Sequence, residues 1–79
     1  MREFDIKLAQ AGHKVCTRSG LNVRIVSYDR QDRFAPIVAL IDDSMEYGEP
    51  HESIEDYPES GHYMYGNKEL DLMIEITQL

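Results

Sequence analysis

The sequence predicts a mainly β domain in which a short N-terminal helix precedes five or six antiparallel strands in sequence order. Three observations favour this fold: a hairpin signal at Ser19-Gly20, an apolar run at residues 36–41, and alternation of apolar residues over 70–75. A chain of 79 residues has room for a single domain, 1–79, with one core. So few residues predict a curled sheet or a small SH3-like barrel, because a flat sheet would expose one apolar face and both edges.

Residues 4–11 predict two turns of helix. Phe4, Leu8 and Ala11 recur at the spacing of one helix face, and Asp5 stands where its carboxylate can cap the first turn. So short a helix is marginal alone. We therefore expect Phe4 and Leu8 to pack onto the sheet.

The next segment predicts a β-hairpin. Residues 14–18 and 21–28 are rich in β-prone side chains, and the Ser19-Gly20 loop between them offers a glycine for the positive φ that tight turns require. Along the second strand the apolar phase changes between Ile25 and Val26. A β-bulge or a strong bend would explain this change.

Residues 36–41 form the most apolar stretch, which a proline introduces. Consecutive apolar residues are typical of a strand that is covered on both faces, so we expect a central strand here. Residues 44–50 read as a loop, 51–57 as a strand of poor propensity, and 62–65 as a short aromatic strand. Leu70, Leu72 and Ile74 then predict a last strand with one buried face.

Charge is divided unevenly along the chain, whose net charge is −7. Residues 1–33 carry seven of the eight basic side chains against four acids, a net charge of +3, and the remainder carries one basic side chain against eleven acids, a net charge of −10. If the fold keeps these segments apart, the surface is bipolar, and self-association between copies becomes a reasonable hypothesis.

The single cysteine, Cys16, excludes an intrachain disulfide and favours a reducing compartment. No secretory leader and no apolar run long enough to span a bilayer is evident, which predicts a cytoplasmic protein without a membrane partner. Lys14 and Arg18 share the face of Cys16 in an alternating strand, but no histidine is placed to act as a base for this thiol. We find no phosphate-binding loop or nucleophile motif, and predict a non-enzymatic protein without a cofactor.

Metal binding has little support in the sequence. His51 and Glu52 resemble the start of a zinc-protease helix, but Glu55 stands where the second histidine is needed, and Pro50 argues against a helix. Convergence of His51, Glu55 and His62 on a metal remains a weak hypothesis, and solvated surface histidines are the favoured interpretation.

Three stretches carry a family resemblance: the hairpin sequence 15–25 (VCTRSGLNVRI), the run 36–41 (PIVALI) and the late strand 71–74 (DLMI). Together they resemble a group of small uncharacterised proteins from Bacteroidales genomes and their phages or mobile elements. The resemblance covers nearly the whole chain and implies a bacterial or phage origin. The group has no assigned activity, so no site residue follows from it.

Two surfaces remain as functional hypotheses. The favoured one is a protein-interaction module that binds an unidentified protein, or a second copy as a homodimer, through an exposed strand edge or an acidic tyrosine-bearing face. Its predicted residues are Tyr47, Glu52, Glu55, Asp56 and Tyr57. The alternative is a nucleic-acid-binding barrel that contacts phosphates through Arg18, Arg24, Arg30 and Arg33. A pI near 4.7 argues against this alternative, and an acidic mimic of nucleic acid is a third hypothesis.

Overall fold

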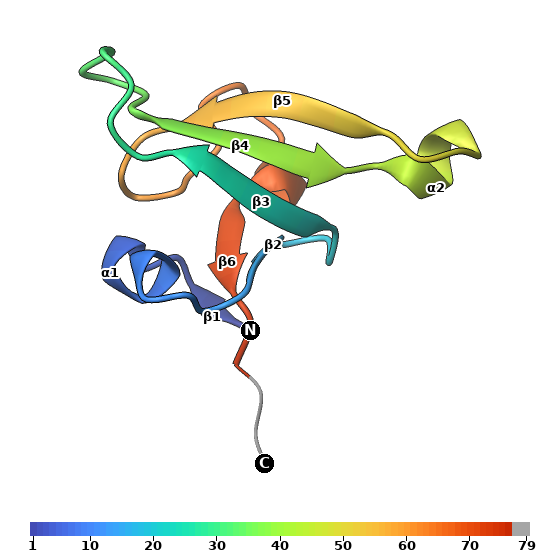
Figure 1. Ribbon diagram of the computed structural model, residues 1–79, viewed down its shortest axis with the longest axis horizontal. Helices are drawn as coiled ribbons and strands as arrows, with labels where there is room; N and C mark the ends of the chain where they lie inside the picture. Colours follow the sequence, from blue (N-terminus) through green and yellow to red (C-terminus); the bar gives the residue numbers. More distant parts are fainter. Residues whose placement is uncertain (77–79) are drawn as a thin grey trace.

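A computed structural model describes residues 1–76 and shows six antiparallel strands in one sheet (Figure 1). The strands are β1 (Arg2–Glu3), β2 (Val15–Thr17), β3 (Asn22–Ser27), β4 (Ile37–Asp42), β5 (Glu52–Tyr57) and β6 (Leu72–Ile74). The helices are α1 (Ile6–Gln10), α2 (Ser44–Tyr47) and a 3-10 turn, η1 (Lys68–Leu70). The mainly β prediction is confirmed, and the sheet is curled rather than closed into a barrel.

The strand order is β1-β6-β2-β3-β4-β5, so the expectation of strands in sequence order is wrong at one place. β6 returns to lie between β1 and β2, with Met73 opposite both Glu3 and Cys16. Leu72, Met73 and Ile74 are all buried in this central position, although the sequence predicted a strand with only one buried face. β1, a strand of two residues, was not predicted.

The N-terminal helix and the hairpin form as expected. The carboxylate of Asp5 accepts hydrogen bonds from the backbone N–H groups of Lys7 and Leu8, which caps α1. The hairpin loop has three residues rather than two, since the N–H of Thr17 donates to the carbonyl of Leu21 at 2.9 Å. Gly20 adopts φ 98°, the left-handed conformation for which the turn needs a glycine.

The predicted bulge lies in β3. The register against β4 shifts between Ile25 and Ser27, so that Ile25 still packs on the core while Val26 is exposed. The change of apolar phase in the sequence therefore records a real irregularity, and the bend lets the sheet curl around its core.

The core lies on one face of the sheet, where β4 contributes the buried side chains of Ile37, Ala39 and Ile41. The opposite face of β4 is only half covered, because Val38 and Leu40 keep intermediate exposure. The expectation that β4 is covered on both faces is thus wrong for its outer face. No helix in residues 1–76 is long and apolar enough to cross a membrane.

The segment between β5 and β6 is a long connection held by polar bonds. Residues 62–65, predicted as an aromatic strand, do not form a strand. The backbone N–H of Tyr63 instead donates a hydrogen bond to the carboxylate of Asp71 at 2.8 Å. The N–H of Leu72 donates to the carbonyl of Gly61 at 2.9 Å. These bonds fix a loop, residues 58–67, beside one end of β5.

Candidate protein-interaction surface

β5 forms one edge of the sheet, and among residues 1–76 the only strand that it pairs with is β4. The N–H of Asp43 donates to the carbonyl of His51, and the register continues from there without a shift. Antiparallel alternation then directs the N–H and C=O groups of Ser53 and Glu55 toward β4, and those of Glu52 and Ile54 outward. Within residues 1–76 these outward groups have no backbone partner.

An exposed apolar side chain marks the middle of this edge. Ile54 is 72% exposed and lies directly opposite Leu40 of β4 on the outer face. Val26, at the bulge of β3, is also exposed. A single exposed apolar residue is ordinary on a surface, but here it coincides with free backbone donors and acceptors.

Two arginine–carboxylate pairs flank Ile54. Arg24 donates to both carboxylate oxygens of Glu52, at 2.8 and 2.7 Å, and this hydrogen bonding lowers the pKa of Glu52. Arg30 donates to Asp56 at 2.9 Å and to Asp32 at 3.0 Å. The basic and acidic segments therefore interleave within one subunit, and the bipolar surface is not formed.

Most of the four arginines of the nucleic-acid hypothesis are paired with carboxylates of the same chain. Besides Arg24 and Arg30, Arg18 lies 3.5 Å from Asp71, and only Arg33 packs instead over the ring of Phe34. Phosphate binding would have to compete with intramolecular carboxylates at three of the four positions.

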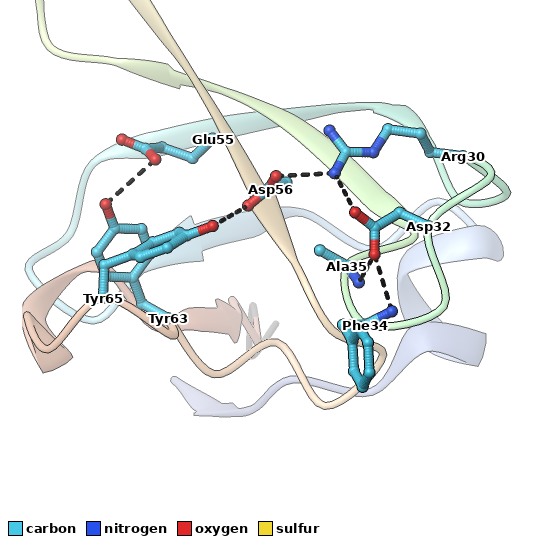
Figure 2. Close-up of polar contacts among 8 residues, drawn as sticks. All are labelled: Arg30, Asp32, Phe34, Ala35, Glu55, Asp56, Tyr63 and Tyr65. Atoms are coloured by element: carbon cyan, nitrogen blue, oxygen red, sulfur yellow. Dashed lines mark hydrogen bonds and ion pairs between the residues drawn. The ribbon is translucent and has the colours of Figure 1, made fainter.

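At one end of β5, a tyrosine pair approaches the strand from the loop 58–67. The hydroxyl of Tyr63 donates to Glu55 at 3.2 Å, and that of Tyr65 donates to Asp56 at 3.4 Å. Figure 2 shows these rings on one side of the strand and Arg30 on the other, so that Asp56 is held from both sides. This end of the edge is partly covered, and Glu52 and Ile54 remain open.

The prediction that Tyr57 belongs to the interaction surface is wrong. Its ring is fully buried in the core, and its hydroxyl donates to the backbone carbonyl of Leu70 at 2.7 Å. Burial raises the pKa of this hydroxyl well above its ordinary value. Tyr57 therefore cannot contact a partner; it anchors β5 to the core.

At the other end of β5, Tyr47 is the last residue of α2 and stacks on His51, with 3.7 Å between ring centroids. Asp43 accepts hydrogen bonds from Ser53 and from Nδ1 of His51, and these two bonds lower the pKa of Asp43. Tyr47 remains 54% exposed, in keeping with its predicted place on the surface.

The three groups of the metal hypothesis are held by different partners. His51 pairs with Asp43, Glu55 with Tyr63, and His62 lies 3.5 Å from Asp71. In the described part of the chain no three His, Cys, Asp or Glu side chains are grouped so that they could hold a metal. The hypothesis of convergence is therefore wrong.

Cys16 is buried in β2, and burial raises the pKa of its thiol. Its Sγ lies 3.2 Å from Sδ of Met1, so the thiol packs against another sulfur. A buried thiol with a raised pKa is a poor nucleophile.

A cleft of about 200 Å³ opens on the inner side of β5, and the sequence did not reveal it. Ser53 and Glu55 line it from β5 itself. Its apolar lining is Leu21, Ile41 and Leu70, and its carboxylates are Asp43, Glu46 and Glu55. None of the described residues that line the cleft is basic, so its potential is negative.

Comparison with known proteins adds no relative: no protein-family model, curated protein or solved structure matches the chain.

Proposed function

We propose that this chain is a non-enzymatic protein-interaction module that binds an extended segment of a partner along the free edge of β5. The observation that carries the proposal is the coincidence of outward backbone groups at Glu52 and Ile54 with an exposed apolar side chain between two ion pairs. An added strand gains affinity from main-chain hydrogen bonds and specificity from alternate side chains.

Other features agree with this proposal. The intramolecular pairs of Arg18, Arg24 and Arg30 disfavour the nucleic-acid alternative. The cytoplasm of a bacterium or a phage-infected cell, the origin that the family resemblance implies, fits a single buried thiol.

The test is a matched pair of substitutions at one position. Ile54→Pro removes the outward N–H, but not a bond to β4, and proline is tolerated on edge strands when its nitrogen faces solvent. Ile54→Val keeps the N–H and a β-branched side chain. Short random peptides displayed on phage are selected on the immobilised wild-type chain, and the affinities of the enriched peptides are then measured for both variants.

We expect binding to Ile54→Pro to fall at least about tenfold and binding to Ile54→Val to stay within about twofold. Circular dichroism of both variants verifies that the sheet is retained. Equal binding by Ile54→Pro and the wild type would exclude the β5 edge as the docking element.

A further inference from the structure

This inference rests on the proposed function. The side chains on the outer and inner faces of β5 determine which residues a partner strand must carry. We infer that the edge takes an extended partner segment with alternating apolar and basic side chains, the apolar residue beside Ile54 and a lysine or arginine over the inner cleft.

The outer face selects an apolar residue. A strand added to β5 places one side chain directly opposite Ile54, within about 5 Å between Cβ atoms. Glu52 and Asp56, two residues to either side, are already paired with Arg24 and Arg30. Their charge is largely neutralised. On this face a partner therefore gains binding free energy mainly by burying the exposed Ile54 side chain.

The inner face selects a basic residue. Side chains opposite Ser53 and Glu55 project on the face where these residues line the cleft of about 200 Å³. Glu46 is exposed there, and within residues 1–76 the Glu55 carboxylate accepts one hydrogen bond, from the hydroxyl of Tyr63 at 3.2 Å. A lysine or arginine can lay its aliphatic stem on the apolar lining while its charged end meets these carboxylates.

A second copy of the chain does not fit the same edge. Antiparallel pairing of two β5 strands centred on Ile54 sets Ser53 of each copy opposite Glu55 of the other, and β5 carries no basic side chain that could meet the cleft carboxylates. Each copy also carries a net charge of −7. The acidic edge therefore opposes self-pairing and admits a basic strand.

The experiment titrates the ¹⁵N-labelled chain with a blocked peptide of sequence Thr-Lys-Val-Lys-Val-Lys-Thr, followed by NMR. The control peptide is Thr-Glu-Val-Glu-Val-Glu-Thr. We expect the basic peptide to shift the amide resonances of Glu52, Ser53 and Ile54 and to bind at least about tenfold more tightly than the acidic one. No shift with the basic peptide, or equal affinity for the two peptides, would overturn the inference.

A matched pair of protein variants separates the effect of the cleft on peptide affinity from the effect of the overall charge. Glu46→Lys reverses a carboxylate that lines the cleft, and Glu49→Lys makes the same change on an exposed residue outside it. We expect Glu46→Lys to weaken the basic peptide about tenfold and Glu49→Lys less than about threefold. Equal weakening would contradict a specific role for the cleft.

The outcomes distinguish this inference from the proposed function. If selected peptides depend on Ile54 but show no preference for basic residues, the edge still binds partners and the inference about their chemistry fails. If no peptide binding depends on Ile54, both fail.

Discussion

Gly61→Ala is expected to destabilise the domain by about 3 kcal/mol, the sum of a left-handed backbone and an overpacked contact. Gly61 has φ 78°, and a Cβ added there would lie 2.7 Å from Cβ and Cγ of Phe4. Such a loss lowers Tm by more than about 10 °C in a domain of this size. Thermal unfolding followed by circular dichroism measures it.

Gly66→Ala is the matched control. Gly66 also has positive φ, at 97°, but an added Cβ would meet no atom within 4 Å. We expect this substitution to cost about 1 kcal/mol from the backbone alone. Replacing Phe4 with glycine, which removes both Cβ and Cγ, should reduce the penalty of Gly61→Ala in that background to the same level, whereas equal effects of the two glycine substitutions would refute the Phe4 contact.

Asp71→Asn is expected to cost about 2 kcal/mol at neutral pH, because a buried carboxylate loses its charge-assisted bonds. The Asp71 side chain is 8% exposed, accepts a hydrogen bond from the N–H of Tyr63, and lies 3.5 Å from both Arg18 and His62. Asparagine keeps the shape and the bond to Tyr63 but not the charge. Urea unfolding of the two chains measures the difference.

The difference should also depend on pH. Burial alone would raise the pKa of Asp71, but the bonds from Tyr63, His62 and Arg18 outweigh it and hold that pKa below its ordinary value. A depressed pKa in the folded state stabilises the fold above about pH 4, and this contribution is lost as pH falls through the folded pKa. Wild type and Asp71→Asn should therefore converge in acid. A gap that stays constant down to pH 2 would contradict the ionised role of Asp71.

These two positions bear on the proposed function through the loop 58–67. Gly61 and Asp71 hold the loop where Tyr63 and Tyr65 reach Glu55 and Asp56, as Figure 2 shows for the two tyrosines. The loop covers one end of the edge and leaves Glu52 and Ile54 open. The docking length of β5 is thus set by the loop that directly follows it and by Asp71, which holds that loop in place.

Local features of this fold were predictable because their causes are local. Asp5 caps a helix through neighbours two and three residues away, and Gly20 supplies the φ that its own turn requires. The bulge after Ile25 appeared as a change of apolar phase, which is a property of one strand. Patterns of this kind need no knowledge of the other strands.

The position of β6 and the composition of the surface were not predictable, because they depend on register between distant segments. Arg24 and Glu52 are 28 residues apart and meet only because β3 and β5 flank β4. The acidic cleft likewise joins four segments of the chain. Tyr57 was placed on the surface because it belongs to an acidic, tyrosine-bearing stretch; in the fold it shares the inner face with Ser53 and Glu55.

Amide hydrogen exchange along β5 tests the central claim most directly, since it reports on each backbone donor of the edge. In the free chain we expect slow exchange at Ser53 and Glu55, which bond to β4, and fast exchange at Glu52 and Ile54. Binding of the lysine–valine peptide should slow exchange at Glu52 and Ile54. Slow exchange at these two amides in the free chain, or no slowing in the complex, would contradict an open edge that receives a partner strand.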